Sequence, residues 1–146
     1  MNWLCSNLQR LQTDRTGSTM IEFAMIGPAM IAMLMGVLQI GTGMKAYNAM
    51  RGASGDLARF AVVNYQTSNK LTDAQLEAYG RSVGISGVYQ LINDRLTVTV
   101  TTPTTQRVSG ATEKSITMVY RVPSVMGILG MNDIDITYTR PVFLIS

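Results

Sequence analysis

The stretch Gly17-Ser18-Thr19-Met20-Ile21-Glu22-Phe23, with the uncharged run from Phe23 to Met44 that continues it, decides the fold of this chain. The run contains 22 residues and no Asp, Glu, Lys or Arg. A helix of that length, rising about 1.5 Å per residue, spans a hydrocarbon layer about 30 Å thick. The sequence therefore predicts a membrane-spanning helix over residues 18–44.

Glu22 lies at the N-terminal edge of this run, and no basic residue occurs within the six positions before it. A carboxylate that enters a bilayer costs about 2.5 to 3.5 kcal/mol on insertion scales, so such a group usually has a partner or a function. Cleavage after Gly17 would supply a partner, because Ser18 would gain a largely protonated α-amino group one helical turn from Glu22. The same carboxylate could instead reach the amine of a neighbouring, axially staggered subunit.

These residues resemble the processing site of class III type IV prepilins. The order is a glycine, four residues, a glutamate and a phenylalanine, with a short leader before it and an apolar helix after it. The segment from Glu22 to Pro28, followed by Ala, Met, Ile and Leu, is similar to the start of TadE-like proteins, the minor pseudopilins of the tight-adherence (Tad, or Flp) pilus. The local similarity covers residues 10–65.

The resemblance implies how the chain is processed and what it does. A prepilin peptidase would cut between Gly17 and Ser18, and Glu22 and Phe23 would then take part in N-terminal amine pairing during assembly. The protein would help to initiate or prime a pilus. Its expected partners are the peptidase, other Tad minor pseudopilins, the major Flp pilin, the inner-membrane assembly platform and the membrane itself.

The resemblance also implies a single-pass protein of the bacterial inner membrane with its C-terminal domain in the periplasm, whether or not it enters the pilus. Basic residues on both sides of the apolar run do not fix this orientation by themselves. Two other interpretations stay open: a permanent signal anchor on a small periplasmic binding or interaction domain, and a pseudopilin of a type II secretion system. The major Flp pilin is disfavoured, since those proteins are little more than the helix.

The composition excludes several functional classes. The chain has 146 residues and no histidine, and its one cysteine, Cys5, lies in the leader, so we expect no Cys/His metal site, no internal disulfide and no cofactor. The net charge is only +3 and no basic cluster occurs, so nucleic acid is not an expected partner. Asp133 and Asp135 alternate with isoleucines, the pattern of a solvated strand face, and we expect no enzymatic activity.

Within the membrane run, Pro28 should bend the helix slightly because it removes a backbone hydrogen bond. Ala32 and Gly36 form a small-xxx-small pair that would let another helix approach closely, although chance in a run rich in Ala, Gly and Met explains the pair equally well. Gln39, near the far end, suits the membrane interface or a helix contact.

The helix is expected to continue to about residue 64, because apolar residues recur every three or four positions beyond the run: Ala46, Met50, Ala53, Leu57 and Phe60. This stripe is predicted to pack on a soluble sheet, with an intersubunit contact as the alternative. Gly52 and Gly55 are placed on the opposite face and make this the weakest stretch of the helix.

The remaining chain predicts a small α+β domain. Thr72 and Gln75 form a capping box that starts a helix ending near Val83, with Gly84 as its stop. Residues 88–92 and 96–101 are expected to pair as strands across an Asn93-Asp94 turn, and two further strands are expected over 116–122 and 134–138. Residues 123–130 are predicted to form a short apolar helix.

The predicted organisation is a leader over 1–17, a transmembrane helix over 18–44 and a periplasmic α+β domain over 45–146. The fold class is α+β, in which a long N-terminal transmembrane helix continues into a small antiparallel sheet head, as in pilins.

Overall fold

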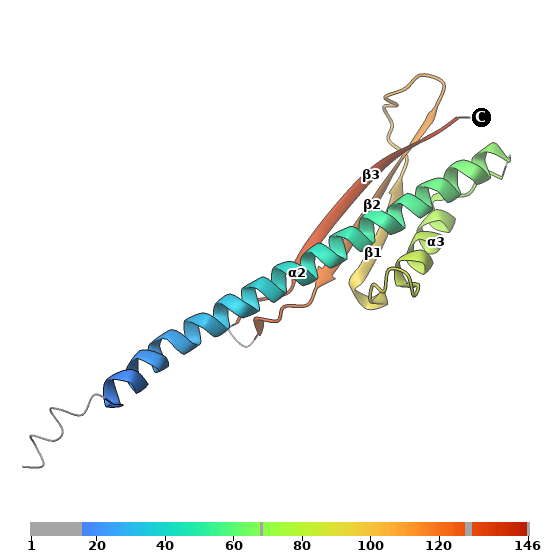
Figure 1. Ribbon diagram of the computed structural model, residues 1–146. Helices are drawn as coiled ribbons and strands as arrows, with labels where there is room; N and C mark the ends of the chain where they lie inside the picture. Colours follow the sequence, from blue (N-terminus) through green and yellow to red (C-terminus); the bar gives the residue numbers. More distant parts are fainter. Residues whose placement is uncertain (1–15, 68, 128–129, 146) are drawn as a thin grey trace, which may run out of the picture. The chain divides into compact units, whose positions relative to one another are not determined.

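The computed structural model describes residues 16–67, 69–127 and 130–145. The predicted leader therefore lies outside the described residues, except for Thr16 and Gly17. The chain divides into two compact units, Met1–Val37 and Leu38–Ser146. In chain order, the elements are helix α2 (Thr16–Gln66), helix α3 (Asp73–Ile85), the 3-10 turn η1 (Asn93–Arg95) and strands β1 (Leu96–Thr101), β2 (Thr112–Val122) and β3 (Ile134–Leu144) (Figure 1).

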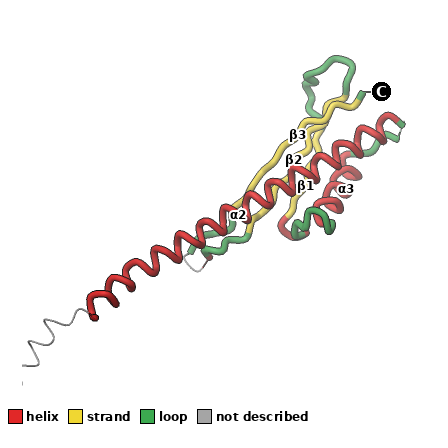
Figure 2. Tube along the Cα trace, viewed as in Figure 1, coloured by secondary structure: helices red, strands yellow, loops and turns green. Residues whose placement is uncertain are grey.

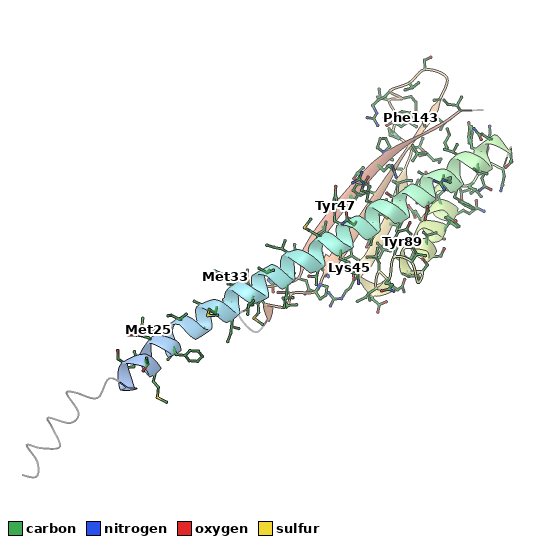
Figure 3. The ribbon with its side chains drawn as sticks, in the orientation of Figure 1. Met25, Met33, Lys45, Tyr47, Tyr89 and Phe143 are labelled. Atoms are coloured by element: carbon green, nitrogen blue, oxygen red, sulfur yellow. The ribbon has the colours of Figure 1, made fainter. Side chains whose placement is uncertain are left out.

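Helix α2 runs without a break from Thr16 through Pro28 to Gln66. Its end at Gln66 confirms the prediction that the helix continues beyond the uncharged run to about residue 64. Among the described residues it is the one helix long and apolar enough to cross a membrane, and none of its most apolar stretch is buried. Met25 and Met33 project away from the helix (Figure 3). The first unit thus offers an apolar surface that the described part of the chain leaves uncovered.

The second unit contains a three-stranded antiparallel sheet in the order β1-β2-β3 (Figure 2). Met118 of β2 pairs with Val98 on one side and Tyr138 on the other. The predicted alternation is confirmed, since Leu96, Val98 and Val100 are buried while the threonines between them are exposed. One face of the sheet therefore belongs to the core and the other faces solvent.

The apolar stripe of α2 packs into this core, as predicted. Ala46, Met50, Ala53 and Leu57 are buried together with the inward side chains of the strands. Phe60 is only partly buried, and its ring stacks on Tyr79 of α3 with centroids 3.7 Å apart and planes 10° from parallel. The helix thus carries the membrane run and one wall of the core on a single element.

Gly52 and Gly55 lie away from the buried stripe, as predicted, but they are half-buried because side chains from other elements cover them. A Cβ at Gly52 would lie 2.4 Å from the ring of Tyr89, and one at Gly55 would lie 2.9 Å from the guanidinium of Arg140. The Tyr89 hydroxyl also donates to Asp56 at 2.7 Å. Both glycines are sites of close approach, which accounts for residues that otherwise lower helix propensity.

The predicted start of α3 is confirmed, but its predicted end is wrong. Thr72 and Gln75 form the reciprocal capping box. The helix continues through Gly84 to Ile85. Gly84 serves close packing and does not end the helix, since a Cβ there would lie 2.6 Å from Cδ2 of Leu96. A glycine that lets a strand approach is indistinguishable in sequence from one that ends a helix.

The predicted strand over residues 88–92 is also wrong. This segment forms turns that lead into η1, with Gln90 at a φ of 55° and the Leu91 amide donating to the Gly84 carbonyl at 3.0 Å. Leu91 is buried, whereas Val88 is largely exposed. The positive φ of Gln90 interrupts the extended chain. The Leu91 amide donates to the end of α3, so it is not available to a partner strand.

Strand β3 is longer than predicted, because it includes the apolar C-terminal tail. Val142 and Leu144 of this tail are buried. In the β2–β3 loop, residues 123–133, the described residues include turns, with Gly127 in a 3-10 conformation, and residues 128 and 129 lie outside the described residues, so the predicted short helix stays a prediction.

At the opposite end of the sheet, an ion pair joins Arg107 of the β1–β2 loop, residues 102–111, to Glu113 of β2. The carboxylate of Glu113 is buried and accepts from Nε of Arg107 at 2.8 Å and from the Arg107 amide at 3.2 Å. The hydrogen bond from the Arg107 side chain is the main reason that the pKa of Glu113 falls below its ordinary value of 4.5.

We expect acid to open this loop. A carboxyl whose pKa is lower in the folded state contributes stability above its unfolded pKa, and that contribution is lost as the pH falls through the folded pKa. The Arg107 amide resonance of the full chain in detergent micelles should therefore titrate with a midpoint below 4.5. Glu113→Gln should abolish the titration, and a midpoint at or above the ordinary value would contradict the assignment.

Candidate functional site

The N-terminal end of α2 contains the residues predicted to direct processing and assembly. Gly17 and Ser18 lie in the first turn of the helix, and the Ser18 hydroxyl donates to Oε1 of Glu22 at 3.2 Å. Helical side chains lean toward the N-terminus, so the carboxylate is aimed back along the chain toward residue 18. Glu22 is the one charged residue in the sequence from Thr16 to Met44.

This end of the helix is sterically open. Ser18, Glu22 and Phe23 are exposed, and a Cβ at Gly17 would meet no atom within 4 Å. Within the described residues, packing therefore places no demand for glycine at position 17. A requirement for a small residue there would have to come from another molecule.

The three residues predicted to permit helix packing lie at spacings of four, so Pro28, Ala32 and Gly36 follow one side of α2. A Cβ at Gly36 would contact nothing within 4 Å. The structure thus presents this small-residue side without bringing it against another described element. Its role in helix packing stays a prediction.

Gln39 is the polar residue whose contacts the sequence did not reveal. Its side chain is only 9% exposed, and both ends of its amide are used by the β2–β3 loop. Nε2 donates to the Pro123 carbonyl at 3.4 Å, and Oε1 accepts from the Val125 amide at 2.8 Å. Gln39 therefore joins a helix position inside the uncharged run to a loop 84 residues later in the chain.

The same loop is held at its other end by Asp133. Its carboxylate accepts from the Ser124 amide at 2.9 Å and from the guanidinium of Arg95 at 2.7 Å. These two hydrogen bonds, with the Ser124 bond the larger cause, hold the pKa of Asp133 below its ordinary value. The neighbouring Asp135 pairs with Arg121 at 3.0 Å. Each carboxylate thus has its own arginine, an arrangement that fixes the loop.

Among residues 16–67, 69–127 and 130–145, no group of three or more His, Cys, Asp or Glu side chains comes together. A largely apolar groove of the second unit runs between α2 and β3 and is lined by Gln39, Ile40, Gly43, Met44, Tyr47, Asn48, Ile134 and Ile136. The candidate site thus consists of three surfaces that could bind another molecule: the N-terminal end of α2, its small-residue side and the groove between α2 and β3.

Comparison with known proteins gives one match. Residues 17–59 match the family model described as TadE-like protein. The match begins at the glycine of the predicted cleavage site and extends through the apolar run into the core stripe of α2. Searches of curated proteins and of solved structures found no significant match. The resemblance is thereby confirmed for residues 17–59, and the chain fits a TadE-like protein of a Tad pilus system.

Proposed function

We propose that the chain is a minor pseudopilin of a Tad/Flp-type pilus assembly machine. A prepilin peptidase removes residues 1–17, and the processed protein helps to initiate or prime the pilus from the inner membrane, with the sheet domain on the periplasmic side. The TadE-like match supports a structural pilus component whose partners are other pilus components. Such a component needs no catalytic site.

The observation that carries the proposal is the contact at the start of α2. Oε1 of Glu22 already lies 3.2 Å from the hydroxyl of Ser18, the residue that would become the new N-terminus. Cleavage would place an ammonium on this same residue, one helical turn from the carboxylate. A charged pair at the edge of a bilayer offsets part of the desolvation that each charge would suffer alone.

Processing can be tested at Gly17. The intact mass of the protein from cells that contain the peptidase is expected to correspond to a chain starting at Ser18. Gly17→Leu should leave the leader attached, because the branched side chain blocks access at the cut. Gly17→Ala, which keeps a small residue and meets no neighbour in the structure, should still be cut.

A stable wild-type species that begins at Met1 in such cells would contradict the proposal. The chain would then be a permanent signal anchor on a small periplasmic domain. A second contradictory result would combine two observations: the protein is cleaved in the wild type, and a strain lacking the gene makes normal Tad pili. That result would count against a role in pilus initiation and would leave the type II secretion alternative.

A further inference from the structure

The β2–β3 loop lies at a membrane depth that can be read from the sequence of α2. Gln39 lies five residues before Met44, the last residue of the uncharged run. At about 1.5 Å per residue this is about 7.5 Å from the end of the run. If the uncharged run spans a bilayer, the loop that hydrogen-bonds to Gln39 is therefore close to the boundary between acyl chains and headgroups.

The composition of the loop fits that depth. Residues 124–131 carry no charge and include Val125, Met126 and Met131, of which Met131 is 54% exposed. Ile40 and Ile134 of the adjoining groove are also exposed. The loop at the opposite end of the sheet, residues 102–111, is instead rich in threonine and polar residues. The apolar loop is thus confined to the end of the sheet at which Gln39 lies.

Several backbone amides of the loop have partners within the protein. In lipid, each amide needs such a partner, since no solvent can supply one. Among the described residues of the loop, five amides have one: Ser124 with Asp133, Val125 with Gln39, Met126 with the Ser124 hydroxyl, Gly130 with the Gly127 carbonyl and Met131 with the Met126 carbonyl.

The two carboxylates at the C-terminal end of the loop form ion pairs. Asp133 pairs with Arg95 and Asp135 pairs with Arg121. Paired charges at the headgroup level are less costly to bring near lipid than single ones. Burial of Gln39 between helix and loop likewise removes a polar amide from the acyl chains.

From these observations we infer that the described part of the β2–β3 loop, residues 124–127 and 130–133, is a second membrane contact, held by Gln39 at the boundary between acyl chains and headgroups. The occupant of this apolar surface is lipid, because Ile40, Gly43 and Met44 of the groove are themselves part of the uncharged run. The inference rests on membrane insertion of α2, which is part of the proposed function.

The test uses the full chain in phosphatidylcholine vesicles with a single tryptophan as a depth probe. Trp3→Phe removes the native tryptophan. Met131→Trp and, separately, Ile134→Trp place the probe in the proposed contact, whereas Val108→Trp places it in the β1–β2 loop at a residue of similar character that is 44% exposed. Vesicles containing lipids brominated on the upper acyl chain report proximity to lipid, and iodide reports exposure to water.

The probes at 131 and 134 are expected to show blue-shifted emission, quenching by the brominated lipid and protection from iodide, because interfacial apolar groups lie about 5 to 10 Å into the headgroup and acyl boundary. The probe at 108 should show the reverse. Gln39→Leu, which fills the same space without the two hydrogen bonds, should move the response at 131 toward that of 108.

Four outcomes would overturn the inference. Equal responses at 131, 134 and 108 in a chain that resists alkaline extraction would place the loop in water while leaving the membrane helix intact. Protection from iodide without quenching by lipid would indicate a protein occupant, such as a second copy. Unchanged lipid quenching of the probe at residue 131 in Gln39→Leu would show that Gln39 does not hold the loop at the membrane. Extraction of the chain by alkali would remove the membrane helix and thereby the proposed function as well.

Discussion

Replacement of Glu22 by glutamine is expected to abolish pilus assembly while leaving membrane insertion and cleavage intact. Glutamine is close to glutamate in size and can still accept from the Ser18 hydroxyl, but it carries no charge to match an N-terminal ammonium. The loss should appear as a near absence of pili and of co-purified pilus components from cells with equal membrane levels of each variant. Glu22→Asp, one methylene shorter, should be intermediate.

Ser18→Ala is the matched control for this result. It removes the hydroxyl that lies 3.2 Å from Glu22 but keeps the amino group that cleavage would create at the same residue. If the amine is the functional partner, Ser18→Ala should assemble normally. Normal pili with Gln at position 22 would show that the carboxylate has no role in assembly, and an equal loss in Ser18→Ala would show that the amine alone does not account for the effect of Glu22.

Leu57→Ala is expected to destabilise the sheet domain more than any change on its surface. Leu57 has no exposed surface, and it lies against Gly80 of α3, where a Cβ would approach its Cδ2 to 2.6 Å. Truncation of a buried leucine costs about 2 to 5 kcal/mol. Because about 1 kcal/mol shifts the melting temperature of a small domain by roughly 4 to 8 °C, the expected loss is measurable by circular dichroism in micelles.

Val63→Ala provides the comparison on the same helix, since Val63 is 52% exposed. A surface change of this kind usually alters the free energy of unfolding by about 0.5 kcal/mol or less. Equal melting temperatures for Leu57→Ala and the wild type would mean that the stripe of α2 does not form the core. Similar losses for both variants would point to helix propensity as the cause.

Much of this architecture could be predicted from the sequence because it depends on local patterns. The run without charges, the capping box at Thr72 and the alternation of Leu96, Val98 and Val100 each report a single element by its own period. The errors and omissions involve contacts between elements. Gly84 meets Leu96, Gly52 meets Tyr89, and the Leu91 amide bonds to the end of α3. The pattern of residues within one segment cannot predict contacts of this kind, because each contact involves a residue from another segment.

The candidate site divides in the same way. Ser18 and Glu22 lie four residues apart, so helical geometry alone predicts their contact. Gln39 could be recognised as an unusual polar residue in an apolar run, but its partners at Pro123 and Val125 are set by how β2 ends relative to the helix. A search for isolated polar residues in apolar runs, followed by a search for exposed apolar loops, would have brought the two together.

The unbroken course of α2 fixes the rotational phase of Gln39 relative to the core. Gln39 and Ala46 share one helix with no intervening break, so their directions are locked by about 100° of turn per residue. A single alanine inserted after Thr42 would leave the stripe from Ala46 onward in the core but rotate Gln39 by about 100° and shift it by about 1.5 Å. The uncharged run would gain one residue and stay apolar, yet the loop would lose its anchor. In this chain, the level of the loop along α2 and its side of the helix are therefore set by the same few residues.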